Sequence, residues 1–350
     1  MINSTSLHTF IIVAVLGVAI AAQAGAAERP APLAPYEGIP EGYIIVQGDM
    51  LVRIDRIDGG RTVQGGFRYA PWPGGVVPYE FDANVSSANR DAMRLAMNEI
   101  EAVCTAVFIP RNGQDDYVHI QAHASECNSE VGCQGGEQII NIASWGWESR
   151  FTMVHELMHT LSFEHEQSRQ DRNTYVGIHW DRIEDGMEHN FEKDADFMYG
   201  PYDFDSVMHY PQCAFSTCAD CTPGCRTITV RDPWAPDWQD EIGQRDHLSR
   251  GDIATLQGLY PESNTVFVDH DPSQYWYPGA PAGSFLNPFP TVGQGVAAVV
   301  PTGNVMVQPG HYISVGTGTS TKYSKPMHLR APLGGVRLDY FPLPMEPGQQ

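Results

Sequence analysis

The stretch HELMHTLSFEHEQSRQDR, from His155 to Arg172, constrains this chain more than any other part of it. His155 and His159 are four residues apart, so on a helix both imidazoles can point from one face toward a single cation. His165 follows six residues later, and Glu156 lies directly beside the first histidine. Neutral imidazoles suit zinc, and three protein ligands leave one position open, as in catalytic zinc sites. The stretch therefore predicts one catalytic zinc ion held by three histidines.

The third histidine also predicts a turn. For His165 to reach the same cation, the helix must end near Leu161 and the chain must turn back. Such a turn usually places glycine in the left-handed conformation, but here the residue is Ser162. A serine in that conformation costs roughly 1–2 kcal/mol, which metal binding and packing can offset. The alternative, a solvated helix that is rich in histidine by chance, is disfavoured, since HExxH arises by chance in about one such chain in a hundred.

The surrounding sequence predicts an α+β fold. SSANRDAMRLAMNEIEAV combines an N-cap serine with apolar residues at helical spacing, and RFTMVHELMHTLSF does the same around the histidines. DYVHIQA and EQIINIA alternate as strands, and GDIATLQGLYP predicts a last helix that ends at Pro261. This order indicates a mixed twisted sheet with helices packed on it, one of them a long active-site helix.

The two ends of the chain differ in composition from the middle. An apolar run that ends in an A-x-A pattern predicts a signal peptide over residues 1–24, with a membrane anchor as the alternative. A proline-rich stretch follows, and YIIVQGDMLVRIDRIDGG predicts one short strand and a turn, so that residues 25–62 precede the main domain. Beyond it, NVMVQPGHYISVG and KPMHLRAPLGGVRL predict a small all-β, β-solenoid-like segment over residues 263–350.

Charge and cysteine content limit the functional classes. The formal net charge of -21 repels nucleic acid, so no nucleic-acid partner is expected. Seven cysteines in an exported chain favour disulfides. Cys127 and Cys133 could close a small loop, and Cys104 is expected to be a buried free thiol. Four close cysteines predict two local disulfides of undetermined pairing, with a metal or iron–sulfur cluster as the alternative: Cys213, Cys218, Cys221 and Cys225.

These motifs together carry a family resemblance. HELMHTLSFEHEQSRQDR, followed by SVMHY, resembles the signature of the astacin family of metzincin zinc endopeptidases, HExxHxxGxxHExxRxDR with a Met-turn SxMHY. WPGGVVPYEF, FIPR and LQGLYP are similar to other parts of that family's catalytic domain. The resemblance covers roughly Val63 to Glu262. It implies a zincin-like catalytic domain over residues 63–262, with one zinc ion and with proteins or peptides as substrates.

The resemblance also implies a role for each motif residue. The implied zinc ligands are His155, His159 and His165. Glu156 would accept a proton from the zinc-activated water and later pass it to the leaving amine. Tyr210 would donate a hydrogen bond to the oxyanion. Met208 would form the apolar floor under the histidines, although an ordinary core methionine would look almost the same.

A further resemblance concerns latency, and it rests on VQGDM. Family precursors carry an F-x-G-D motif whose aspartate takes the zinc position meant for water; Gly48 and Asp49 match, while Val46 replaces the aromatic residue. The glycine would let the backbone pass close to the cleft. The alternative is a plain Gly-Asp turn. The chain is therefore expected to be a zymogen that Asp49 keeps inactive.

Activation would create a new amino terminus. The family's spacing puts that terminus near Val63, with a cut between Gly60 and Gln64 and with Arg61 as a trypsin-like site. Glu166 matches the family glutamate that contacts the buried new terminus, although it could equally be a surface carboxylate.

Several features depart from the family pattern or leave alternatives open. Trp147 stands where the family has a cysteine, and the family's closing cysteine is absent, so the usual two disulfides cannot be assumed. EQIINIA occupies the place of the family's edge strand, where a substrate would add, or else it is an interior strand. The first functional hypothesis is a secreted endopeptidase with no stable membrane association. The alternatives are a surface- or polysaccharide-binding protein with a vestigial zinc domain, and a non-catalytic domain that zinc stabilises.

Overall fold

The computed structural model describes residues 40, 42–54, 57–58, 61–62, 70–193, 199–271, 280–314, 325–334 and 336–340. The predicted signal peptide and Val63, where the mature amino terminus is expected, lie outside these residues. No helix within the described ranges has both the length and the apolar character needed to span a membrane.

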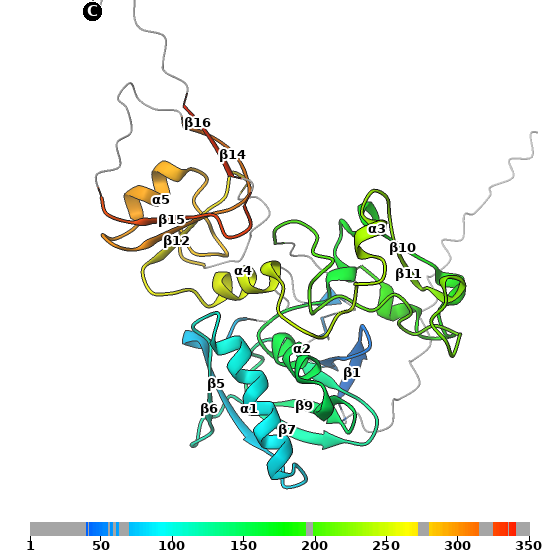
Figure 1. Ribbon diagram of the computed structural model, residues 1–350. Coiled ribbons are helices and arrows are strands. Elements are labelled where there is room, and N and C mark those ends of the chain that lie inside the picture. The colour runs from blue at the N-terminus through cyan, green and yellow to red at the C-terminus, as the bar shows by residue number, and fades with distance from the viewer. Residues whose placement is uncertain are drawn as a thin grey trace, which may run out of the picture. The chain divides into compact units, whose positions relative to one another are not determined.

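Most strands and the two longest helices of the described residues lie before residue 161, and the chain is largely irregular from there to residue 249 (Figure 1). The strands before residue 263 are β1 Tyr43–Val46, β2 Met50–Arg53, β3 Ile57–Asp58, β4 Arg61–Thr62, β5 Val76–Phe81, β6 Val107–Pro110, β7 Tyr117–His123, β8 Asn128–Glu130, β9 Glu137–Ala143, β10 Val176–Ile178 and β11 Ile228–Val230. The α-helices there are α1 Ser87–Glu101, α2 Arg150–Thr160, α3 Ala235–Trp238 and α4 Arg250–Leu259. Short 3₁₀ helices lie at Pro73–Gly75, Gly146–Glu148, Glu166–Ser168, Arg172–Thr174, Trp180–Arg182, Glu188–Phe191 and Pro223–Cys225.

The main sheet has seven strands in the order β1-β2-β8-β9-β7-β5-β6. Strands β9, β7, β5 and β6 run parallel to one another, whereas β8 is antiparallel to β9. The predicted mixed sheet is thus confirmed. Strand β9, which is EQIINIA, lies between β7 and β8, so its assignment to the edge of the sheet was wrong and the interior alternative holds. Within the catalytic part of the chain, the short strand β8 takes the position next to the N-terminal strands.

The N-terminal stretch forms more structure than the predicted single strand. Strands β1 and β2 make an antiparallel hairpin, and β2 pairs in parallel with β8. Gln47 and Gly48 adopt positive φ angles of 51° and 81° in the turn between the two strands. This hairpin therefore extends the sheet of the catalytic part by two strands.

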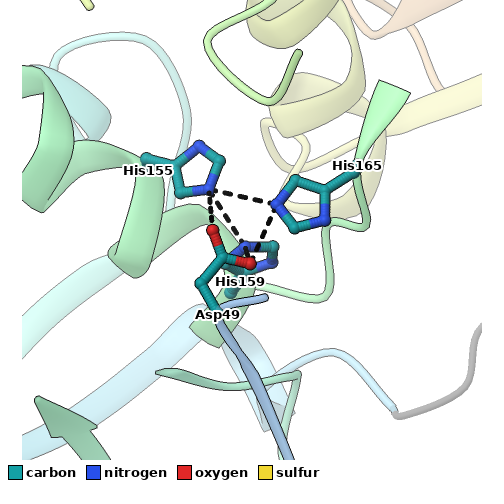
Figure 2. Close-up of side chains that lie close together, drawn as sticks. All are labelled: Asp49, His155, His159 and His165. Carbon is teal, nitrogen blue, oxygen red and sulfur yellow. Dashed lines mark hydrogen bonds and ion pairs between the residues drawn. The ribbon is translucent and has the colours of Figure 1, made fainter. Parts of the chain in front are cut away.

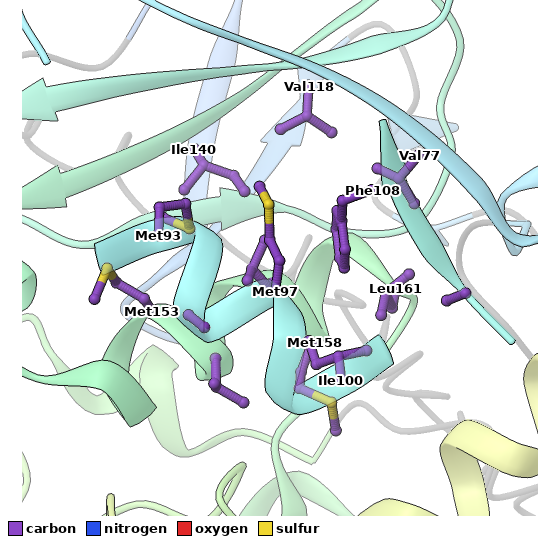
Figure 3. Close-up of a cluster of buried hydrophobic side chains, with 14 of the residues drawn as sticks. Val77, Met93, Met97, Ile100, Phe108, Val118, Ile140, Met153, Met158 and Leu161 are labelled. Atoms are coloured by element: carbon purple, nitrogen blue, oxygen red, sulfur yellow. The ribbon is translucent and has the colours of Figure 1, made fainter. Parts of the chain in front are cut away.

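Helix α1 and helix α2 pack against the sheet. Ser86 caps α1, its side chain accepting a hydrogen bond from Asn89 N, as the sequence predicts. The apolar residues at helical spacing face inward and form one core with α2 and the sheet (Figure 3), including Val77, Met93, Met97, Ile100, Val118, Ile140, Met153, Met158 and Leu161. Because this core anchors α2 along its length, the helix is a rigid platform for the residues that it carries.

The cysteines agree with the sequence in part. The disulfides are Cys213–Cys221 and Cys218–Cys225, so the local pairing is confirmed and the metal-cluster alternative is wrong. Cys104 is a half-buried free thiol, as expected.

The loop closure proposed for Cys127 and Cys133 is wrong, since both are free thiols. The intervening strand β8 is extended, and Cys127 packs into the core, where its sulfur accepts from Ala143 N at 3.4 Å. An extended strand separates its two ends, so these cysteines cannot meet.

The C-terminal segment stacks parallel strands but is not all-β. Its elements are β12 Thr265–Val268, α5 Val292–Ala298, β13 Asn304–Val307, β14 Gly310–Ser314, β15 His328–Arg330 and β16 Val336–Tyr340. Strands β12, β13 and β15 pair in parallel, as do β14 and β16, which fits successive solenoid coils. Helix α5 corrects the all-β prediction. A Cβ at Gly295 would lie 2.5 Å from Val268 Cγ2, so glycine lets α5 pack closely on β12, while in the sequence the same glycine weakens the helical signal.

Candidate metal centre

Helix α2 holds the first two histidines on one buried face. Ser149 caps the helix by accepting from Thr152 N, and Leu161 follows its last residue. His155 is 2% exposed and His159 is fully buried. Ser162 then adopts a φ of 81°, the left-handed turn that the position of His165 requires. The sequence therefore predicted correctly both the end of the helix and the unusual conformation of the serine.

The three histidines converge on one point, and Asp49 reaches it from the N-terminal hairpin (Figure 2). His155 Nε2 lies 3.2 Å from His159 Nε2 and 3.3 Å from His165 Nε2. The Asp49 carboxylate lies 3.0 Å from His165 Nε2, 3.2 Å from His155 Nε2 and 3.6 Å from His159 Nε2. All candidate ligand atoms of the four residues fall within 4.8 Å of one another. This is the size and donor set of a mononuclear metal site.

The other ring nitrogen of each histidine indicates the tautomer. His155 Nδ1 lies 2.8 Å from Val207 O, and His159 Nδ1 lies 2.8 Å from Phe163 O. His165 Nδ1 lies 3.0 Å from the side-chain oxygen of Gln47. Because carbonyl oxygens only accept, each Nδ1 carries the proton and each Nε2 presents its lone pair to the shared centre. Three converging lone pairs and a carboxylate repel one another without a cation, so these residues fit zinc.

The protonation states support the same assignment. Burial lowers the pKa of His155 to about 3 and also lowers the pKa of His165, so both imidazoles are neutral and free to ligate. Burial would raise the pKa of Asp49, but the histidine rings that surround its carboxylate hold the pKa well below its usual value. Asp49 is therefore ionised, as an oxygen ligand must be.

Glu156 lies beside the metal ligands without being one of them. Its carboxylate is 2% exposed, and Oε2 has no hydrogen-bond partner among the described residues. Burial and the nearby charge of Asp49 raise its pKa well above the usual value. A buried carboxylate that binds protons tightly suits a group that accepts and later returns a proton.

Met208 and Tyr210 lie on the turn after Ser206. Met208 is 1% exposed, belongs to the main core and accepts from Glu166 N at 3.2 Å through its carbonyl. The Tyr210 ring packs on the His165 ring, with 4.7 Å between centroids. Its hydroxyl donates to the carbonyl of Gln47. The turn thus places the Tyr210 ring against His165 and the Met208 carbonyl beside Glu166, the residue after His165.

The turn that carries Asp49 is tightly packed. A Cβ on Gly48 would lie 2.6 Å from Phe215 Cζ and 2.8 Å from the Tyr210 hydroxyl. Only glycine fits at this φ of 81° and in this space. Asp49 O also accepts from Ser129 N at 2.9 Å, which joins the turn to strand β8.

Glu166 lines a cavity of about 90 Å³ together with Ser162, Arg169 and Asp203. Its Oε1 accepts from Asp203 N at 2.7 Å and lies 3.3 Å from Arg169 Nη1. Burial raises its pKa to about 8, although Arg169 lowers it in part. Glu166 is thus no simple surface carboxylate, since it is largely buried and faces a cavity beside His165.

Sequence reasoning missed three residues that shape the centre. Asp252 holds the turn before Met208, because its carboxylate accepts from Ser206 Oγ at 2.7 Å and from Val207 N at 2.9 Å. The sequence SRGD carries a signal for this residue, because Ser249 caps helix α4 and Asp252 is the acidic residue at the third helical position of a capping box. Phe215 and the side chain of Gln47 have no motif that would single them out; their roles arise from contacts between distant parts of the chain.

Comparisons with known proteins show which family the chain resembles. The family model for astacin, a family of peptidases, matches residues 66–261. Zinc metalloproteinase nas-14 of Caenorhabditis elegans is 37% identical over 195 residues, which are 54% of this chain and 37% of that protein. Low choriolytic enzyme of Oryzias latipes is 34% identical over 185 residues, which are 53% of this chain and 65% of that protein. A solved structure of High choriolytic enzyme 1 from Oryzias latipes is 32% identical and covers 54% of this chain and 92% of that chain, with a TM-score of 0.48.

The aligned part of the chain spans less than two thirds of the length of these two curated relatives. The matched residues of the family model nevertheless make up more than half of the chain and include the three histidines, Glu156, Met208 and Tyr210. The chain therefore belongs to the astacin family of peptidases.

Proposed function

We propose that this chain is an exported, zinc-dependent endopeptidase made as a latent precursor. The observation that carries the proposal is the convergence of three histidine Nε2 atoms on one point, next to the buried carboxylate of Glu156. A vestigial site or a purely structural one would not need Glu156, which ligates nothing. The apolar run that ends in an A-x-A pattern and the two disulfides support export.

When bound, zinc would polarise the scissile carbonyl and acidify a water molecule. His155, His159 and His165 would hold the ion. Glu156 would accept the proton of the water and deliver it to the leaving amine, acting as base and then as acid. The Tyr210 hydroxyl, which donates to Gln47 O in this structure, would donate to the developing oxyanion once that carbonyl withdraws.

In the precursor, the Asp49 carboxylate occupies the position that the water needs, and hairpin β1–β2 covers strand β8. We therefore assign latency to this hairpin, called here the N-terminal segment (residues 40–54). Removal of the segment, with a cut between Gly60 and Gln64, would open the centre. The new amino terminus near Val63 would then approach Glu166, whose cavity has room for an ammonium group.

The test is peptide-library cleavage by the activated protein, with and without a chelator, alongside Glu156→Gln. The variant should still bind one zinc ion, measured by elemental analysis, because its three ligands are intact. It should cleave peptides about a hundred to ten thousand times more slowly than the parent, because the general base is removed. Turnover by Glu156→Gln at the parental rate, or parental turnover that resists chelation, would overturn the proposal.

A further inference from the structure

Strand β8 borders the metal centre within the catalytic part of the chain. One of its edges pairs with β9, and among the described strands its other edge pairs only with β2 of the N-terminal segment. Ser129 N donates to Asp49 O, so this edge runs directly past the metal position. Once the segment leaves, the free backbone groups of β8 can pair with another extended chain.

The side chains of β8 alternate between the two faces of the sheet. Ser129 faces helix α2, because its Oγ lies 3.0 Å from Thr160 Oγ1. Glu130 therefore points to the opposite face. Leu51 of β2 is the register partner of Glu130, so their side chains lie on the same face of the sheet. Arg53 lies two residues after Leu51 in β2 and therefore also lies on this face, together with Tyr43, its register partner in β1.

Glu130 is covered by the segment but poorly satisfied. Its side chain is 1% exposed, and neither carboxylate oxygen receives a hydrogen bond of ordinary length from the described residues. Burial raises the pKa of Glu130 to about 7, and the Tyr43 hydroxyl, the backbone of Ile139 and the charge of Arg53 partly offset that rise. Tyr43 and Arg53 belong to the segment and depart with it, whereas Ile139 stays in β9. In the released enzyme the carboxylate therefore loses its two side-chain partners and faces the vacated strand position with acceptor capacity to spare.

The neighbouring carboxylate differs in this respect. Glu137 of β9 is exposed and accepts a hydrogen bond from the Tyr117 hydroxyl, and the Arg111 guanidinium lies over the Tyr117 ring at 3.4 Å from its centroid. Glu137 therefore has partners within the catalytic part, and it adds negative charge near Glu130 without competing for its oxygens.

The register gives the position of the contact. Asp49 lies at the metal centre, and Leu51, two residues further on, faces Glu130. A chain in the place of β2 therefore presents to Glu130 a side chain about two residues, or roughly 7 Å, from the one at the metal. Strand β2 itself runs parallel to β8. A substrate that runs the opposite way, antiparallel to β8, places this side chain on the amino-terminal side of its scissile bond.

We propose that Glu130 is a specificity-determining residue that selects a lysine or arginine side chain of the substrate, about two residues to the amino-terminal side of the cleaved bond. This inference rests on the proposed peptidase function. An arginine guanidinium can donate two parallel hydrogen bonds to the two carboxylate oxygens, and a lysine ammonium can form an ion pair with them. The net charge of -21 also attracts basic substrates to the enzyme.

The experiment uses the activated, zinc-loaded enzyme and pairs of fluorogenic peptides that differ at one position, lysine against glutamine or glutamate, scanned along the amino-terminal side. The parent should cleave the lysine peptide with a kcat/KM about 10- to 100-fold above that of its glutamine partner. This ratio corresponds to the usual free-energy contribution of a hydrogen bond to a charged group. Glu130→Gln should bring this ratio near one, and Glu130→Lys should make the enzyme prefer the glutamate peptide. Glu137→Gln, which removes a nearby charge without removing the two acceptor oxygens, should lower the ratio far less than Glu130→Gln does.

The outcomes separate the two proposals. A parent enzyme that cleaves peptides without any preference for a basic residue on the amino-terminal side overturns the assignment of Glu130 and leaves the peptidase function intact. An unchanged lysine-to-glutamine ratio in a zinc-loaded Glu130→Gln or Glu130→Lys variant does the same. A parent that cleaves no peptide overturns the peptidase function and this inference together. Because the substrate scan of the parent needs no variant, the inference remains testable if a variant fails to fold.

Discussion

Gly48→Ala provides the sharpest test of latency, because it leaves Asp49 in place and alters only the space around it. An alanine at this φ of 81° costs roughly 1–2 kcal/mol in backbone strain. Its Cβ would also lie 2.6 Å from Phe215 and 2.8 Å from the Tyr210 hydroxyl, an overpacking that typically costs about 1–3 kcal/mol. Both costs fall on the state in which the segment covers the centre. The covered state should therefore weaken by about 2–5 kcal/mol, or roughly thirtyfold to several-thousandfold.

Gly42→Ala is the matched control. Gly42 also belongs to the N-terminal segment and has a φ of 91°, but a Cβ there would meet no atom within 4 Å. This variant suffers the backbone strain without the clash at the metal centre.

The assay is the rate of peptide cleavage by purified precursors whose intact mass is verified, with Asp49→Ala as the reference for a leaky precursor. Gly48→Ala should leak far more than Gly42→Ala. Proteolytic activation should then bring both to the parental rate, because the mature chain no longer contains either residue. If the uncleaved Gly48→Ala precursor were as inactive as Gly42→Ala, the contact with Phe215 and Tyr210 would not contribute to latency and the reasoning would fail.

Three further predictions concern other parts of the molecule. Mass spectrometry of non-reduced peptides should find Cys213 joined to Cys221 and Cys218 to Cys225; any other pairing contradicts the structure. Ser162→Gly should raise the free energy of unfolding by about 1 kcal/mol and the melting temperature by about 2–4 °C, because glycine relieves the left-handed strain; a lower melting temperature would contradict this. The pKa of Glu130 is raised from 4.5 to about 7 under the segment, so the protonated carboxyl favours the covered state. The contribution of Glu130 to inhibition of the mature enzyme by a synthetic segment should be fully present below about pH 4.5. It should be lost, by at most about 3 kcal/mol of binding free energy, as the pH rises through about 7. The same titration in Glu130→Gln should lack this part of the pH dependence, and an identical slope would remove Glu130 as its cause.

The metal centre could be predicted from the sequence because its geometry is mostly local. His155 and His159 follow from helical periodicity, and Ser162 from the need to turn the chain back toward His165. The disulfides of the four-cysteine insert are local for the same reason, since eight and seven residues separate the paired cysteines. Local constraints of this kind require no knowledge of how distant strands meet.

The sheet edge could not be predicted in this way. Strand β8 is three residues long, NSE, and has no apolar alternation, so it carries no strand signal, whereas the interior strand β9 alternates clearly. Its pairing with β2 joins segments about eighty residues apart and depends on the Gln47–Gly48 turn. Helix α5 was missed because Gly295, needed for packing on Val268, lowers the helical propensity of VGQGVAA. In each case a tertiary contact overrides a weak local preference.

The contacts of the N-terminal segment explain why a single cut would suffice for activation. The segment reaches the centre through Asp49, through the Tyr210–Gln47 hydrogen bond and through two register pairs between β2 and β8. A two-stranded hairpin of this length is marginally stable by itself in water. While it is covalently attached, its effective concentration at the centre is on the order of millimolar, which keeps the weak pairing closed. A cut near Arg61 removes that advantage, and charge on Glu130 then disfavours rebinding at neutral pH and above. Latency would thus depend on covalent attachment more than on the intrinsic affinity of the segment.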